Sequence, residues 1–102
     1  MSLICIAQAN EVTTGKMKRI TLESGHRVLL VNVNGEFFCI DDTCSHEDAS
    51  LYLGCLNDDL VKCPMHGSRF NVRTGQPMEE PADEPVATWP ITRVGDELCI
   101  DT

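Results

Sequence analysis

The hydrophobic residues of this chain occur in short runs that are separated by turn-forming residues. The two clearest runs, RVLLVNV at 27–33 and EFFCID at 36–41, flank Asn34-Gly35. Asn-Gly between two such runs is the strongest short-range signal for a two-residue hairpin, because both residues tolerate the positive φ angles of a type I′ turn. The pattern therefore predicts two antiparallel strands joined by a tight turn.

The rest of the chain follows the same pattern, and no segment has the apolar period of a helix. Further strands are predicted at residues 3–7, 17–22, 60–62, 87–94 and 97–101. Many short strands at this spacing predict an all-β fold, with antiparallel sheets in a small sandwich or barrel. A chain of 102 residues has the size of one domain, so we expect residues 1–102 to form a single unit.

Three segments interrupt this β pattern. Two are loops, at about 43–56 and 63–69, and each contains a cysteine and a histidine close together. The third, QPMEEPADEP at 76–85, holds three prolines and four acids. Its composition predicts a constrained surface loop that cannot join a sheet ladder through its prolines. On the pattern alone, this loop is a solvated acidic connection.

The net charge of −8 and the sequence pI near 4.6 narrow the range of partners. Affinity for nucleic acid is built from clustered Lys and Arg, so we expect no nucleic-acid partner and favour a protein with a basic face. The amino-terminal residues MSLICIAQAN lack the positive region of a signal peptide, and the apolar stretch at 28–33 is far too short to span a bilayer. The sequence therefore predicts a cytoplasmic protein with no membrane contact.

The cysteines lie at positions 5, 39, 44, 55, 63 and 99. Without an export signal, thiols or metal ligands are favoured over a disulfide framework. Cys5, Cys39 and Cys99 fall in predicted strands among apolar residues, where a free thiol behaves as a small hydrophobe. Cys55 lies in the first loop and is interpreted as buried filler, with a spare thiol or a redox-sensitive site as alternatives.

Cys44, His46, Cys63 and His66 form the motif C-x-H, sixteen intervening residues, then C-x-x-H. Two thiolates and two imidazoles suit either zinc or a Rieske-type iron-sulfur cluster. Zinc fingers usually group like ligands, with at least two residues between the members of a pair, whereas each pair here is mixed. Mixed pairs suit a binuclear cluster in which two cysteines bind one iron and two histidines bind the other. A Rieske cluster is therefore favoured, and structural zinc is the alternative.

With CSH, CPMHGS and RTG in a β context, the chain resembles the Rieske 2Fe-2S proteins over nearly its whole length. It is similar in particular to the small soluble ferredoxins of bacterial aromatic-ring-hydroxylating dioxygenase systems. The resemblance implies that one 2Fe-2S cluster binds in a subdomain formed by the two loops. It places Cys44 and Cys63 on the inner ferric iron, and His46 and His66 on the outer iron near the surface.

The chain also departs from the respiratory Rieske proteins that it resembles within the loops. Ala49 and Met65 stand where those proteins carry two cysteines that form a disulfide, so that bridge cannot form. Ser68 matches a serine that donates a hydrogen bond to cluster sulfur, but Phe70 replaces the tyrosine that donates another. Hydrogen bonds to sulfur favour the more negative, reduced cluster. We therefore expect a reduction potential at the low end of the Rieske range, about −150 mV.

Two sets of residues near the predicted ligands, the prolines of the acidic segment and the acids after His46, each allow two interpretations. Pro81 in the acidic segment matches the proline loop that covers the cluster in this family, although Pro85 is an alternative. Glu47 and Asp48 directly follow His46 and either steer a basic partner or are ordinary loop acids.

A cluster with all four protein ligands has no open coordination position, so it passes an electron and does little else. An oxygenase of the related class needs a second iron held by two histidines and a carboxylate, and only His26, interpreted as a surface residue, remains. No glycines are spaced as in G-x-G-x-x-G, so electrons must arrive from another protein.

The resemblance therefore implies a carrier, not an enzyme, between an NAD(P)H-dependent flavoprotein ferredoxin reductase and a terminal aromatic-ring-hydroxylating oxygenase. We expect a monomer that contacts both proteins transiently, near His46 and His66. The Rieske small subunit of a nitrite reductase is the alternative function, and it would belong to a stable complex.

Overall fold

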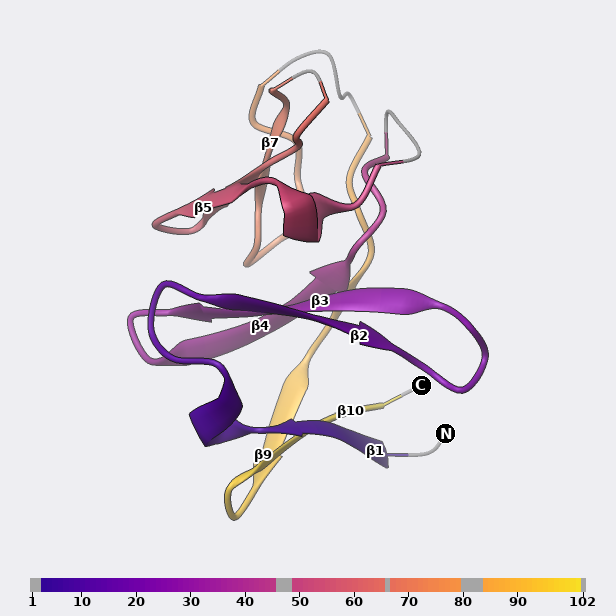
Figure 1. The fold of residues 1–102 in the computed structure, drawn as a ribbon, viewed down its shortest axis with the longest axis vertical. Coiled ribbons are helices and arrows are strands. Elements are labelled where there is room, and N and C mark those ends of the chain that lie inside the picture. Colours follow the sequence, from indigo (N-terminus) through magenta and orange to yellow (C-terminus); the bar gives the residue numbers. More distant parts are fainter. Residues whose placement is uncertain (1–2, 46–48, 66, 80–83, 102) are drawn as a thin grey trace.

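The computed structural model describes residues 3–45, 49–65, 67–79 and 84–101. These residues form ten β-strands and two short 3₁₀ turns, and they contain no α-helix. The strands make three antiparallel sheets that are stacked along the long axis of the molecule (Figure 1). The predicted all-β class is therefore confirmed. No helix in the described ranges is long and apolar enough to cross a membrane.

The first sheet lies in the middle of the molecule, and its strand order is β2-β3-β4-β8. Its strands are β2 (Met17–Thr21), β3 (Arg27–Val33), β4 (Glu36–Asp41) and β8 (Thr88–Trp89). Asn34 and Gly35 have φ angles of 52° and 91°, the positive values that a type I′ turn requires. The predicted hairpin is thus confirmed at both of its strands. Residues 28–33 of β3 are buried, because sheets cover both faces of this central strand.

The second sheet has the order β1-β10-β9 and packs against one face of the first (Figure 1). Its strands are β1 (Leu3–Gln8), β9 (Ile91–Val94) and β10 (Glu97–Asp101). Leu98 packs with Leu30, and Ile100 packs with Val28. The single strand predicted at 87–94 is wrong in one respect: Pro90 divides it, because proline has no N–H to donate to a ladder. Its first part joins the first sheet and its second part joins the second.

The third sheet lies at the other end of the molecule and has the order β5-β6-β7. Its strands are β5 (Cys55–Asn57), β6 (Leu60–Lys62) and β7 (Arg69–Asn71), and a 3₁₀ turn at Leu51–Leu53 precedes β5. The sequence predicted only β6, because the loops predicted at about 43–56 and 63–69 included part of β5 and the start of β7. Leu29 and Ile40 of the first sheet share one buried cluster with Val61 and Phe70 of the third. This cluster joins the third sheet to the rest of the fold.

Cys5 and Cys99 form a disulfide, which corrects the prediction that both are free thiols. The two residues lie directly opposite each other on β1 and β10. The hydrophobic pattern predicted that both cysteines lie in strands, but such a pattern does not show which strands pair. The two residues are 94 positions apart, so no local signal indicated their contact. The bond ties the first strand of the chain to the last.

We expect a Cys5→Ser variant to unfold with a free energy about 2 to 4 kcal/mol lower than the unmodified protein. The crosslink closes nearly the whole chain, so its loss returns conformational entropy to the unfolded state. Chemical denaturation under non-reducing conditions measures the difference. Cys55→Ser is the matched control, because Cys55 is exposed and outside the disulfide. Equal midpoints for the two variants would contradict this role.

Candidate metal centre

Each predicted metal-binding loop is the turn of a hairpin that starts with a cysteine. In the first loop, Thr43 and Ser50 form an antiparallel bridge, and the Cys44 N–H donates to the Ala49 carbonyl at 2.9 Å. In the second, β6 and β7 are the arms, and the Cys63 N–H donates to the Ser68 carbonyl at 2.7 Å. Both loops thus close with a cysteine bonded to the residue five positions later. The same closing hydrogen bond therefore occurs at the base of both loops.

Gly67 is the residue that allows the second loop to turn. Its φ angle is +78°, a conformation that side-chain-bearing residues rarely adopt. Its N–H donates to the Cys63 carbonyl at 3.2 Å. The glycine in CPMHGS is therefore explained by backbone geometry, and it needs no role in ligand binding.

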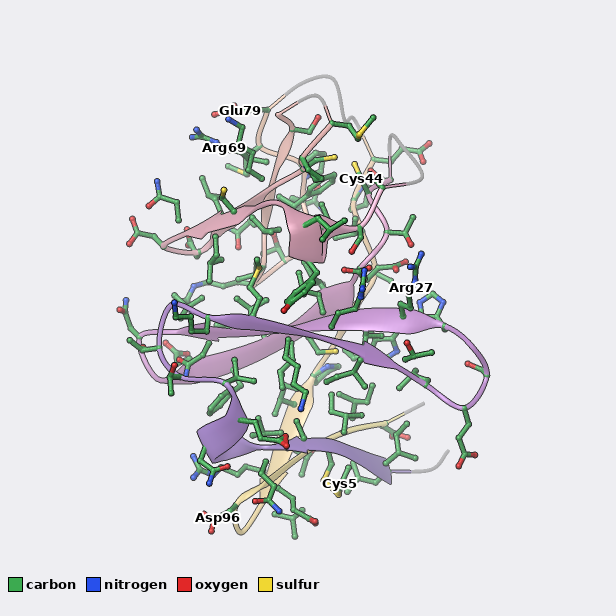
Figure 2. The ribbon with its side chains drawn as sticks, viewed as in Figure 1. Cys5, Arg27, Cys44, Arg69, Glu79 and Asp96 are labelled. Atoms are coloured by element: carbon green, nitrogen blue, oxygen red, sulfur yellow. A yellow bond between two sulfur atoms is a disulfide. The ribbon has the colours of Figure 1, made fainter. Side chains whose placement is uncertain are left out.

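Cys44 and Cys63 are both buried, with exposed fractions of 4% and 1%. They belong to the same cluster of buried side chains, together with Leu51, Val61 and Phe70. Figure 2 shows Cys44 beside the third sheet, at the opposite end of the molecule from Cys5. A buried thiolate needs a compensating positive charge, so two buried cysteines in one cluster suit a metal-sulfur group better than solvent-facing chemistry. The described half of the predicted ligand set therefore fits such a group.

His46 and His66, the other two predicted ligands, lie outside the described residues, as do Glu47 and Asp48. Their assignment stays a prediction from the sequence. The structure describes the backbone up to Ser45 and from Ala49 in the first loop, and Met65 and Gly67 in the second.

The described ends of the acidic segment, 76–79 and 84–85, each contact one of the two loops. Its first part pairs with β7, where the Met78 N–H donates to the Arg69 carbonyl at 2.7 Å. Its last part meets the first loop, where the Ser45 hydroxyl donates to the Glu84 carbonyl at 2.6 Å. Pro81 lies outside the described residues. The segment is thus more than a solvated connection, because hydrogen bonds link its two ends to the two different loops.

Pro77 takes part in an isolated bridge with Phe70, although its nitrogen has no proton to donate. The hydrogen bonds there come from neighbouring residues, since the Asn71 N–H donates to the Gln76 carbonyl at 2.9 Å. The predicted constraint therefore holds at Pro77, whose own nitrogen donates no hydrogen bond. An ion pair between Arg69 and Glu79, 3.4 Å apart, adds a side-chain contact on the surface (Figure 2).

A family model described as the Rieske [2Fe-2S] domain matches residues 2–90 of the chain. The chain belongs to this Rieske family. Its cofactor is accordingly a Rieske 2Fe-2S cluster. The family match therefore confirms the prediction, made from the motif, of an iron-sulfur cluster in preference to zinc.

Relatives of this Rieske protein match it over nearly its whole length. The ferredoxin component of biphenyl 2,3-dioxygenase from Rhodococcus jostii (strain RHA1) is 40% identical over 101 residues, which cover 99% of this chain and 94% of the relative. The solved structure of Sphingomonas yanoikuyae B1 ferredoxin is 30% identical, with a TM-score of 0.95 and 99% of both chains covered.

A third similar protein was solved together with a partner. A chain in the complex of reduced oxygenase and oxidized ferredoxin in carbazole 1,9a-dioxygenase is 28% identical to this Rieske protein. The TM-score is 0.92, and the match covers 96% of this chain and 91% of the other.

Ser68 and Phe70 occupy interior positions in this Rieske domain, with exposed fractions of 1% and 0%. Phe70 is among the largest fully buried side chains of the described residues, so its ring fills space in the core of the third sheet. Ala49 also packs against that core, whereas Met65 is 60% exposed. Since positions 49 and 65 hold alanine and methionine, the second pair of cysteines found in the respiratory Rieske proteins is absent from these two positions.

The remaining cysteines differ sharply in their surroundings. Cys39 is buried on β4 opposite Trp89, as predicted for a small hydrophobe. Burial, followed by the nearby charge of Asp41, raises the pKa of the Cys39 thiol to about 12. Cys55 is exposed, so the prediction of a buried filler is wrong. The alternation of β5 turns Leu56 toward the core and leaves Cys55 outside.

We expect iodoacetamide at neutral pH to modify Cys55 rapidly and to leave Cys39 unmodified until the protein unfolds. The thiolate is the reactive form, and a raised pKa together with burial keeps the Cys39 thiol protonated and inaccessible. Peptide mass spectrometry after timed alkylation of the cluster-loaded protein measures both sites. Equal labelling of the two cysteines would contradict the burial of Cys39.

Among the described residues, one group of three potential metal ligands lies close together, and it is far from the two loops. Cys5, Cys99 and Glu97 bring two sulfur atoms and a carboxylate within 4.8 Å of one another. The sulfurs are bonded to each other, so neither is a thiolate that can bind a metal.

Proposed function

We propose that this protein is a one-electron carrier between an NAD(P)H-dependent flavoprotein ferredoxin reductase and a terminal aromatic-ring-hydroxylating oxygenase. The observation that carries the proposal is the similarity to a dioxygenase ferredoxin component, which is 40% identical and covers 99% of this chain. In this proposal the terminal oxygenase, a separate protein, holds the site for the aromatic substrate. The carrier therefore needs no catalytic residue of its own.

Within this function, Cys44 and Cys63 hold one iron, and His46 and His66 hold the other. The cluster supplies one-electron redox chemistry when it is bound. The chain supplies two thiolate ligands from buried positions, in the same cluster of buried side chains as Leu51 and Phe70. Full ligation leaves no position for a substrate, which supports a carrier instead of an enzyme.

The end of the molecule that carries the two loops has exposed apolar side chains suited to brief contacts with partners. Leu53 is 67% exposed, Met65 60% and Tyr52 40%. An open pocket of about 530 Å³ lies between the loops and is lined by Leu53, Lys62 and Met65 among others. A transient electron-transfer contact needs only a small patch of this kind. The proposed location is the cytoplasm, where such a carrier acts as a monomer.

The test starts with electron paramagnetic resonance of the anaerobically purified protein, before and after dithionite. A rhombic signal with a low average g that appears only on reduction supports the carrier. A colourless, silent protein would point to zinc and overturn the proposal. NADH-driven reduction through a flavoprotein reductase, followed by oxygenase turnover, then tests the two partners. A stable, large complex with a nitrite reductase subunit would replace the oxygenase assignment.

We expect a reduction potential near the low end of the Rieske range, about −150 mV. Phe70 is fully buried and has no hydroxyl, so it cannot donate the hydrogen bond that stabilises a reduced cluster. An optical redox titration of the purified protein measures the midpoint. A value well above zero would contradict this explanation.

A further inference from the structure

Asp42 is a fully buried acid at the start of the first loop, with an exposed fraction of 0%. Both of its carboxylate oxygens accept hydrogen bonds. The Ser50 hydroxyl donates to Oδ2 at 2.7 Å, and the Tyr52 N–H donates to Oδ1 at 3.1 Å. Its carbonyl also accepts from the Leu51 N–H at 2.7 Å. Asp42 therefore fastens the returning half of the loop, residues 50–52, to its starting point.

Ser50 extends this contact to the first sheet. Its hydroxyl oxygen accepts a hydrogen bond from Arg19 Nη1 at 3.0 Å while it donates to Asp42. Arg19 lies on β2, and its guanidinium also sits 5.4 Å from the centre of the Tyr52 ring. A chain from Arg19 through Ser50 to Asp42 thus connects the edge of the first sheet with the loop that carries Cys44.

We propose that Asp42 is a positioning residue of the metal centre, which fixes the first loop through Ser50 and Arg19 and whose negative charge holds the reduction potential down. The proposal rests on the proposed role of Cys44 as a ligand. Nothing in the motif C-x-H points to Asp42, because it looks like one acid in the run Ile-Asp-Asp.

The charge argument follows from distance and burial. Asp42 precedes Cys44 by two positions, so their Cα atoms are at most about 7 Å apart. Both of its carboxylate oxygens accept hydrogen bonds, from the Ser50 hydroxyl and the Tyr52 N–H, which hold the side chain in place. A negative charge close to the cluster-binding loop opposes the arrival of an electron, and burial reduces its screening by salt.

The first variant is Asp42→Asn, which keeps the shape of the side chain and removes its charge. We expect the equilibrium constant for reduction to rise about tenfold, which is an upward shift of about 59 mV for a one-electron couple. Asp96→Asn is the matched control, because it removes the same charge from a side chain that is 90% exposed at the far end of the molecule (Figure 2). A potential in Asp42→Asn equal to that of the control would overturn the charge role.

The positioning role is tested separately at Ser50, which leaves Asp42 in place. We expect Ser50→Ala to lose its cluster at least tenfold faster than the unmodified protein in a chelator challenge, because the loop is no longer tied to Arg19. Ser50→Thr keeps the hydroxyl and is expected to restore the slow rate. Cluster loss from Ser50→Ala at the unmodified rate would overturn this part.

The unmodified protein separates this inference from the proposed function. If it shows no Rieske signal on reduction, the ligand assignment fails and the variants are not needed. If it shows the signal and the variants behave like their controls, only the role of Asp42 fails.

Discussion

His46→Cys and His66→Cys variants are expected to lose the Rieske electron paramagnetic resonance signal completely. That signal depends on mixed ligation, with two neutral imidazoles on one iron and two thiolates on the other. Replacing an imidazole by a thiolate adds negative charge to the cluster. Where a cluster still assembles, its potential should fall from about −150 mV toward the value of about −400 mV that is typical of clusters with four cysteine ligands. Spectra and redox titrations of the reduced variants measure both changes.

His26→Ala is the control for these variants. The His26 side chain is 47% exposed, lies 3.5 Å from Asp41 as a potential ion pair, and contacts the Trp89 ring edge-on. Those contacts belong to the first sheet, so the variant should keep the signal and the potential of the unmodified protein. A normal Rieske signal in either ligand variant would remove that histidine from the ligand set.

Gly54→Ala is expected to lower the free energy of unfolding by about 3 kcal/mol or more and to reduce cluster content with it. Gly54 follows the 3₁₀ turn at Leu51–Leu53, and a Cβ on this residue would overlap the carbonyl oxygen of Lys62. That carbonyl is backbone and directly precedes Cys63, so it cannot move aside as a flexible side chain would. The added methyl group must separate β5 from β6, or displace the second loop.

Gly95→Ala provides the comparison for Gly54→Ala. Gly95 has a φ angle of +61° and nothing within 4 Å of the added Cβ, so alanine there costs only the backbone penalty of about 1 to 2 kcal/mol. Chemical denaturation and the ratio of iron to protein measure the two effects. If Gly54→Ala were no less stable than Gly95→Ala and retained a full cluster, the close approach to Lys62 would have no structural importance.

Local signals in the sequence were sufficient for much of the fold. The hairpin at Asn34-Gly35 was predicted with the bounds of both strands, because its turn type demands residues that accept positive φ. The strand at 97–101 was also predicted correctly, since its short apolar run, Leu98 to Ile100, directly follows a turn signal at Gly95-Asp96. Short strands such as β5 and β7 were missed because their stability comes from pairing with β6 and not from a pattern of their own.

For the candidate metal centre, sequence spacing predicted Cys44, His46, Cys63 and His66 as ligands, because metal binding restricts residue type and separation more tightly than packing does. It did not identify Asp42 or Ser45, whose importance lies in contacts with Ser50 and Glu84. Hydrogen bonds between residues eight and thirty-nine positions apart leave no local signal.

The sequence by itself thus determined the β class, the central hairpin, the motif of two cysteines and two histidines, and the family that this motif indicates. Only the tertiary structure decided that Cys5 and Cys99 are bonded, that Cys55 faces solvent, and that Arg19 reaches the first loop through Ser50. The physical reason is the same in each case. Turn geometry and metal ligation are imposed by residues near each other in the chain, whereas strand pairing and buried polar contacts depend on which distant segments the packed core brings together.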